Sequence, residues 1–191
     1  MKRLIQLLLV LAICTTAGAQ NTQKLYEEGK ALYDAENYTA ALPKLQAAAE
    51  KGHKKAQYRL GRCYDKGLGT KEDDDKAFEW YSKSAAQDYA KAQYQVGKCY
   101  KNGEGVAKDR KKAVEWWQKA AKQDNGNAQL ALGKSYLKGK GVATDQAKAK
   151  SLLKKAVANE KDGKDILQEL RQEAAKGDED AKTILEIVGK K

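Results

Sequence analysis

The chain has 191 residues, of which 41% are hydrophobic, so it is long and apolar enough for a domain with a real core. It carries 37 Lys and Arg against 26 Asp and Glu, a formal net charge of +11. This excess favours anionic partners such as acidic proteins, phosphorylated envelope lipids or nucleic acid, although exposed lysines can also serve only to solvate helices. The single histidine excludes the usual zinc sites, because carboxylates would have to supply the ligands almost alone.

Residues 1–19 have the features of a secretory signal peptide. A basic start precedes an apolar run over 4–13, and small residues predict cleavage after Ala19. The mature chain would then be periplasmic or extracellular. Lipid attachment at Cys14 is the alternative, but the large Ile13 before it disfavours that reading. No second apolar run is long enough for a membrane helix, which leaves no transmembrane segment in the mature chain.

The segment 20–55 predicts a first pair of helices joined by a short turn. Gly29, Ala41 and Ala49 occupy positions suited to close helix packing. Pro43 falls early in the second of these helices, where its missing backbone donor does little harm.

Three segments of similar sequence follow, at 56–91, 92–127 and 128–163. LGRCYDKG in the first returns as VGKCYKNG and then as LGKSYLKG, and a fixed period of this length is typical of a solenoid. Each segment begins with a helix whose packing residues share one face. These residues are Ala56, Leu60, Cys63 and Tyr64, then Ala92, Val96, Cys99 and Tyr100, then Ala128, Leu132, Ser135 and Tyr136.

Gly61, Gly97 and Gly133 lie inside these first helices, where glycine costs about 1 kcal/mol relative to alanine. Their recurrence predicts close approach of a second helix. Cys63 and Cys99 hold equivalent positions on neighbouring helices, whose axes should lie about 8–10 Å apart, whereas a disulfide requires Cα atoms about 4.4–6.8 Å apart. Both cysteines are therefore predicted to be packing residues.

A glycine turn ends each first helix and leads to a second one. The turns read GLG, GEG and GKG, without the strand, third glycine or terminal Lys-Ser/Thr of a nucleotide-binding loop. Asp73, Asp109 and Asp145 are predicted to cap the second helices. The apolar face of these helices predicts that their tryptophans belong to the core and do not form a ligand platform. Its residues are Ala77, Trp80, Tyr81 and Ala85, then Ala113, Trp116, Trp117 and Ala121, then Ala149, Leu152, Leu153 and Val157.

Residues 164–191 predict two capping helices, around Ile166–Lys176 and Asp178–Val188, with charged outer faces. Together the segments predict an all-α solenoid of antiparallel helix pairs.

The repeated order of Ala, LG, CY or SY, GxG, Asp, KA and WY or WW resembles the Sel-1-like repeat, a subclass of the tetratricopeptide superfamily. The resemblance covers 56–163. It implies a right-handed superhelix that serves as an adaptor or scaffold for protein complexes. The first pair, 20–55, lacks the GxG turn and is closer to an ordinary tetratricopeptide unit.

Catalysis is not expected. Ser135–Lys138 and Ser151–Lys154 match the S-x-x-K spacing of penicillin-recognising enzymes, and some cysteine-rich relatives of the family have been described as β-lactamases. The companion S-D-N and K-T-G motifs are absent. A β-lactamase-like hydrolase is thus only a remote alternative, and we expect no cofactor and no metal.

A partner-binding surface is predicted on the first helices, which line the concave groove in the family that the chain resembles. Opposite the packing stripe lie tyrosines and basic residues that would form a ladder if the repeats stack. The predicted partner-binding residues are Tyr26, Lys30, Tyr58, Arg62, Tyr94, Lys98, Lys101 and Lys134.

This surface suits an acidic protein or peptide. Two alternatives remain open at this point. In one, the tyrosines pack between adjacent first helices and the lysines only solvate the surface. In the other, the chain binds an anionic envelope glycan or lipid through charge alone. A nucleic-acid partner is not expected, since no recognised nucleic-acid module is present.

Overall fold

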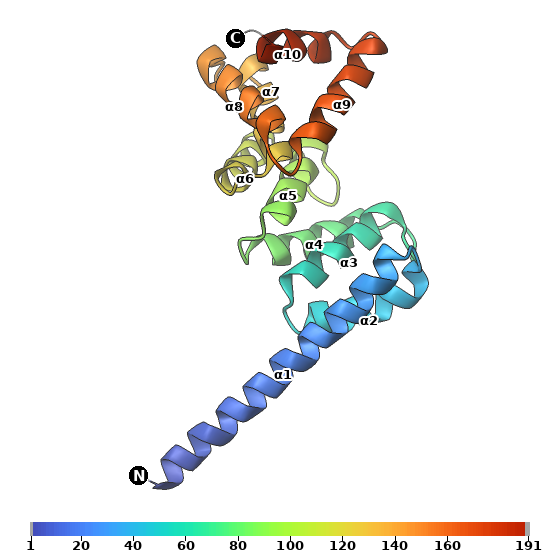
Figure 1. Cartoon of the computed structure of the whole chain (residues 1–191), viewed down its shortest axis with the longest axis vertical. Helices are drawn as coiled ribbons and strands as arrows, with labels where there is room; N and C mark the ends of the chain where they lie inside the picture. The colour runs from blue at the N-terminus through green and yellow to red at the C-terminus, as the bar shows by residue number, and fades with distance from the viewer. Residues whose placement is uncertain (1, 190–191) are drawn as a thin grey trace. The chain divides into compact units, whose positions relative to one another are not determined.

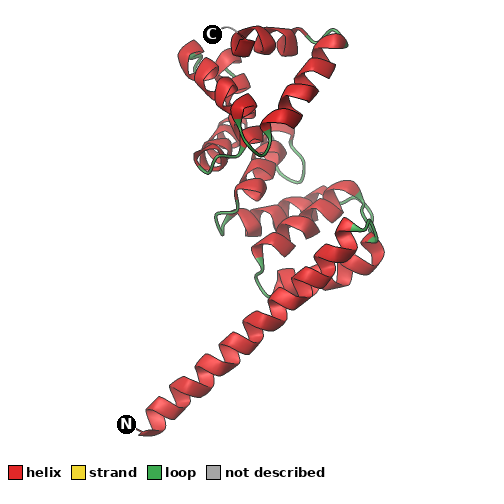
Figure 2. Ribbon diagram, viewed as in Figure 1, coloured by secondary structure: helices red, strands yellow, loops and turns green. Residues whose placement is uncertain are grey.

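The computed structural model describes residues 2–189, and side chains from residue 18 onward. It is all-helical over this range, with no strand (Figure 2). The side chain of Cys14 and most of the predicted signal peptide at 1–19 lie outside the residues whose side chains are described. No helix within the described range is both long enough and apolar enough to cross a membrane. The predicted all-α fold of antiparallel helix pairs is confirmed.

The chain forms two compact units, the first ending at Gln87 and the second beginning at Asp88. In the first unit, α1 packs on α2, α2 on α3 and α3 on α4 (Figure 1). These helices are α1 (Lys2–Asp34), α2 (Tyr38–Glu50), α3 (Lys54–Lys66) and α4 (Asp74–Ala85).

The second unit holds two repeat pairs and the C-terminal pair. Here α5 packs on α6, α6 on α7 and α7 on α8, while α9 and α10 pack on each other and on α8 (Figure 1). The helices are α5 (Ala90–Asn102), α6 (Arg110–Lys122), α7 (Gly126–Lys138), α8 (Gln146–Ala158), α9 (Gly163–Ala175) and α10 (Glu179–Gly189).

The glycines inside the first helices lie against the second helices, as predicted. A Cβ at Gly61 would come within 2.7 Å of the Tyr81 ring, and one at Gly133 within 2.8 Å of Leu153. Gly97 is in the same relation to Trp117. The three helix pairs therefore share one packing device, in which a large side chain of the second helix covers a bare patch of the first.

The predicted helix caps and the predicted burial of the cysteines are also found in the structure. Asp73, Asp109 and Asp145 each accept backbone hydrogen bonds at the start of a second helix. Cys63 and Cys99 are both buried and form no disulfide within the described residues.

The tryptophans divide into two groups. Trp117 is buried, as predicted for a core residue. Trp80 and Trp116 are only half-buried, and the ammonium groups of Lys83 and Lys119 lie 4.2 Å and 4.1 Å from their ring centres. A cation over the outer ring face accounts for the exposed part of these indoles.

Candidate functional site

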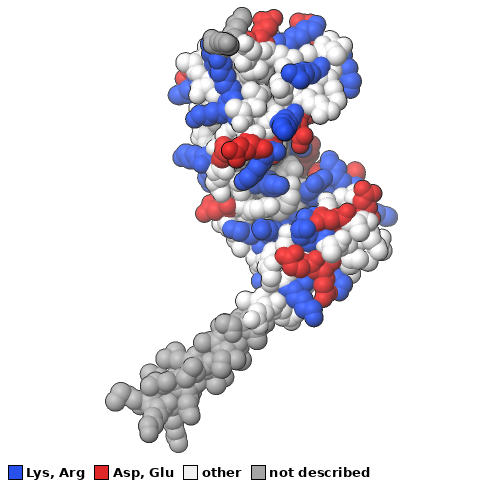
Figure 3. All heavy atoms as spheres, viewed as in Figure 1, with Lys and Arg blue, Asp and Glu red and all other residues white. Residues whose placement is uncertain are grey.

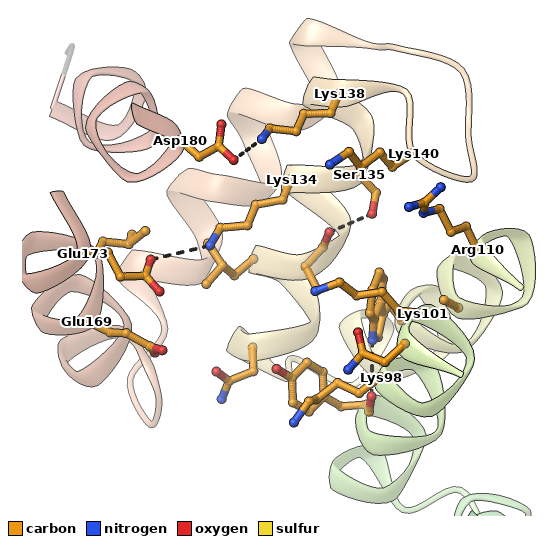
Figure 4. A pocket seen from close by; sticks show the side chains of 18 of the residues that line it. Lys98, Lys101, Arg110, Lys134, Ser135, Lys138, Lys140, Glu169, Glu173 and Asp180 are labelled. Carbon is orange, nitrogen blue, oxygen red and sulfur yellow. Dashed lines mark hydrogen bonds and ion pairs between the residues drawn. The ribbon is translucent and has the colours of Figure 1, made fainter. Parts of the chain in front are cut away.

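A basic pocket in the second unit brings together four of the predicted partner-binding residues. Tyr94, Lys98 and Lys101 enter it from α5 and Lys134 from α7. The cavity measures about 470 Å³ and is also lined by α6, the loop after α7, and the C-terminal helices α9 and α10 (Figure 4). All these elements belong to the same compact unit.

The pocket has an apolar wall. Ala113, Trp117, Leu130, Ala131 and Leu170 contribute to its lining. Trp117 is held in place because its Nε1 donates a hydrogen bond to the carbonyl oxygen of Tyr94 at 3.2 Å. A ligand can therefore contact both apolar surface and charge in this pocket.

Two lysines of the pocket are paired with carboxylates from the C-terminal helices. Lys134 lies 3.9 Å from Glu173 of α9, and Lys138 forms an ion pair with Asp180 of α10 (Figure 4). The hydrogen bond from Lys138 lowers the pKa of Asp180 below its ordinary value. Each of these two lysines is thus matched by one carboxylate of the chain itself.

The remaining cations of the pocket have no such partner. They are Lys98, Lys101, Lys108, Arg110 and Lys140, here called the unpaired cations. Across residues 18–189, no carboxylate lies within ion-pairing distance of any of them. The pKa of Lys101 is lowered, first by burial and then by repulsion from Lys134, Lys98 and Lys140. Glu104 acts on Lys101 in the opposite direction, but it forms no ion pair with it, so positive charge is concentrated in this pocket.

The GxG turn after α7 places Lys140 beside Arg110. Gly139 takes a left-handed conformation at the end of α7, with φ of 65°. Gly141 then packs on the backbone of Arg110, where a Cβ would come within 2.6 Å of the carbonyl carbon. Lys140, between the two glycines, is held next to the first residue of α6. Figure 4 shows Arg110 and Lys140 near Ser135, away from Glu173 and Asp180.

The other four predicted residues lie in the first unit. Tyr26 is 5% exposed and stacks on the His53 ring with centroids 4.1 Å apart, so the prediction that it faces a partner is wrong. Lys30 is half-buried and pairs with Asp34 at 2.7 Å. The structure therefore gives both residues partners within the chain: Tyr26 contacts His53, the N-cap of α3, and Lys30 pairs with Asp34 of α1.

Tyr58 and Arg62 are half-buried on α3. The Tyr58 ring lies 5.8 Å from that of Tyr81 in a tilted arrangement. The Tyr58 ring thus contacts α4, the second helix of its own pair. A groove contact for Tyr58 and Arg62 stays a prediction.

In the first S-x-x-K pair, both the hydroxyl and the ammonium group have other partners. The Ser135 hydroxyl donates to the Ala131 carbonyl oxygen at 2.9 Å, and Lys138 is engaged by Asp180. Ser151 is exposed on α8. No cluster of three or more His, Cys, Asp or Glu suited to a metal ion occurs among the described residues.

Sequence reasoning missed the part of the pocket that does not come from first helices. Arg110 and Lys140 lie on the start of α6 and the glycine turn, and the paired carboxylates lie on the capping helices. A usable signal was present, because Lys140 stands between two glycines that recur in every repeat.

Comparison with solved structures finds the same fold. A Sel1 repeat protein from Oxalobacter formigenes matches with a TM-score of 0.67 and 29% identity, over 82% of this chain and 72% of the other. A protective antigen of uropathogenic Escherichia coli, described as displaying an SLR fold, matches with a TM-score of 0.73 and 25% identity. That match covers 93% of this chain and 40% of the antigen.

A local similarity exists to a rat protein named DAP3-binding cell death enhancer 1. The two are 49% identical over 41 residues, which is 22% of this chain but only 8% of the rat protein. The similarity is therefore confined to a short part of that relative.

The family model for the Sel1 repeat matches three consecutive segments, at 54–89, 90–125 and 126–160. Each match begins two residues before the corresponding predicted segment. Since the three matches cover more than half of the sequence, and the solved structures share the fold, the chain belongs to the Sel1 repeat family.

Proposed function

We propose that this chain is a scaffold that binds an acidic segment of a partner protein in the basic pocket of its second unit. Repeats of this family generally serve protein–protein interaction and are typically non-catalytic. The observation that carries the proposal is the set of unpaired cations beside an apolar wall in one cavity. Carboxylates would neutralise the cations, and an apolar side chain between them would cover the half-buried Leu130 and Ala131.

Lys98 and Lys101 provide the test, because both line the pocket and come from one helix. The probe is a labelled Glu-rich peptide with one leucine, titrated into the full chain at about 0.15 M salt. Changing both lysines to Glu should weaken binding by about tenfold or more. The matched control changes Lys111 and Lys122, exposed on α6 outside the pocket, to Glu. Equal effects of the two double variants would overturn the proposal.

A second candidate is an envelope-associated module that recognises anionic glycan or lipid through charge alone. Lys and Arg side chains are spread over the face of the second unit seen in Figure 3, with acidic residues interspersed. Binding by charge alone collapses at moderate salt, because exposed charges are screened. A pocket with desolvated apolar contacts keeps part of its affinity. Titrations with the acidic peptide and with anionic vesicles, each repeated at high salt, separate the two candidates.

Export is part of the same proposal and rests on the sequence of residues 1–19. The expected result is a mature protein beginning at Gln20, found outside the cytoplasm. N-terminal sequencing of the processed chain tests this directly. A mature terminus at a lipid-modified Cys14 would support the anchored alternative, and an unprocessed Met1 would contradict export.

A further inference from the structure

The cations of the basic pocket fall into two sets, those that form an ion pair with a carboxylate of the chain and those that do not. Lys134 and Lys138 are each matched by one carboxylate, from Glu173 and Asp180. Glu169 of α9 also lines the pocket and forms no ion pair within the described residues, and Figure 4 shows it on the side of Glu173, away from Arg110 and Lys140. The carboxylates of Glu173 and Asp180 thus each balance one lysine, and the excess of positive charge in the pocket belongs to the unpaired cations.

The excess charge is gathered at one place. The packing of Gly141 on the backbone of Arg110 keeps Lys140 beside Arg110. Lys98, Lys101 and Lys140 line the same cavity, and the pKa of Lys101 is lowered, after burial, by repulsion from Lys134, Lys98 and Lys140. Helix α5, the start of α6 and the loop after α7 thus each contribute cations to the lining of the same cavity (Figure 4).

Such a cluster favours a compact ligand that carries more than one charge. A carboxylate brings one negative charge, and neutralising the cluster would need several of them crowded together. A phosphorylated side chain brings a charge of about −1.5 to −2 at neutral pH and three strong acceptor oxygens. The planar guanidinium of Arg110 can donate two parallel hydrogen bonds to such a group, and the lysines can act as point charges around it.

We propose that the unpaired cations bind a phosphorylated serine or threonine of the partner's acidic segment. Arg110 and Lys140 contact the phosphoryl oxygens from the side of α6, and Lys98 and Lys101 contact them from α5. This assignment rests on the proposed function, since it specifies the chemistry of the segment that enters the pocket. The neighbouring apolar wall then receives a side chain beside the phosphorylated residue.

The test compares three labelled peptides that differ at one central position, occupied by phosphoserine, glutamate or serine in the same acidic sequence. Binding to the full chain is measured at about 0.15 M salt. The phosphoserine peptide is expected to bind about tenfold or more tightly than the glutamate peptide. Equal affinity for these two would overturn the phosphoryl assignment and leave the acidic-segment proposal standing. Failure of all three to bind would overturn both.

Two variants locate the site. Arg110→Lys keeps the positive charge but removes the guanidinium that can donate two parallel hydrogen bonds. It should therefore weaken binding of the phosphoserine peptide several-fold and leave binding of the glutamate peptide nearly unchanged. Lys140→Gln should likewise weaken binding of the phosphoserine peptide, whereas the control Lys122→Gln should leave the affinity for both peptides unchanged. Arg110 and Lys140 are exposed, so these variants are expected to fold, which thermal unfolding checks. If Arg110→Lys and Lys140→Gln weaken both peptides alike, the phosphoryl assignment fails.

Two further arms identify the source of the phosphoryl group. Inorganic phosphate and vesicles containing phosphorylated inositol lipid are added as competitors of the phosphoserine peptide. We expect competition only at far higher concentrations of either. Competition by phosphate or by the vesicles at the same concentration as the peptide would show that the peptide around the phosphoserine adds no affinity. That result would overturn the assignment to a phosphorylated protein.

Discussion

Gly97 on α5 lies directly against the indole ring of Trp117 on α6, and Trp117 in turn donates a hydrogen bond to the Tyr94 carbonyl oxygen at 3.2 Å. The missing side chain at Gly97 makes room for the ring, and the hydrogen bond fixes its orientation. Because Tyr94 and Trp117 both line the basic pocket, this contact sets one wall of the proposed site.

Gly97→Ala is therefore expected to destabilise the protein. Alanine would gain about 1 kcal/mol of helix propensity, but a methyl group would overlap the buried ring, and overpacking of this kind costs about 1–3 kcal/mol or more. We expect a net loss of about 1–2 kcal/mol in the free energy of unfolding, measured by urea denaturation. Gly189→Ala, near the end of α10 with no atoms within 4 Å of the added methyl, is the control and should change little. A Gly97→Ala variant as stable as wild type would contradict the packing described for Trp117.

His53 should make stability depend on pH below neutrality. Its Nδ1 accepts the Ala56 backbone hydrogen bond at 3.2 Å as the N-cap of α3, and its pKa is lowered by burial and then by Lys55, with Glu27 acting in the opposite direction. The folded state therefore disfavours the protonated ring. The stabilisation is fully present above the unfolded pKa of about 6.5 and is lost as pH falls through the lower folded pKa.

His53→Asn tests this dependence, since asparagine can still cap α3 but does not titrate. Thermal unfolding between about pH 5 and about pH 8 should show a decline at low pH for wild type and a flatter profile for the variant. His53 is the only histidine in the chain, so no other imidazole contributes. Parallel profiles for the two proteins would argue against a role for this ring.

Lys101 should lower stability while it contributes to binding. Burial and the neighbouring lysines lower its pKa, so its charged form is disfavoured in the folded state at neutral pH. Stability should rise as pH increases through that lowered pKa. Lys101→Met should therefore raise the midpoint of thermal unfolding slightly and weaken binding of the acidic peptide. Lys111→Met, outside the pocket, should do neither, and a lower midpoint for Lys101→Met would count against the charge cluster.

Gly141→Ala should both destabilise the second unit and weaken the pocket. Gly141 has φ of 79°, and its Cβ would meet the backbone of Arg110. Strain and contact together should cost about 1–3 kcal/mol. Gly177→Ala is matched for strain, with φ of 95°, but has open space around the added methyl. A larger loss at Gly141, seen by urea unfolding, would measure the contact with Arg110, while equal losses would show that this contact is unimportant.

The repeat pattern predicts the helices well because the same few contacts are used three times. The glycines opposite Tyr81, Trp117 and Leu153 and the aspartate caps follow from spacing alone. Short-range periodicity reveals which face of a helix packs. It does not reveal which distant loop packs on which helix, so the recurrent glycines mark the turn that holds Lys140 but do not predict its position beside Arg110.

The error at Tyr26 has a similar cause. Its spacing matches that of Tyr94, which does line the pocket. Tyr26 is instead covered by the ring of His53, which caps α3, whereas the equivalent cap position before α7 holds Asn125. Equivalent positions in a repeat can thus differ in exposure when one neighbouring residue changes, and a single sequence does not reveal such a contact in advance.

The central claim is that acidic ligands enter the basic pocket, and mapping the binding site on the full chain tests it most directly. Isotope-labelled protein is titrated with the Glu-rich peptide, and the amide signals are followed by NMR. The account predicts that the largest shifts fall on Lys98, Lys101, Arg110 and Lys140, with small changes on the helices of the first unit. Shifts spread evenly over exposed lysines, or centred on residues before Gln87, would contradict it.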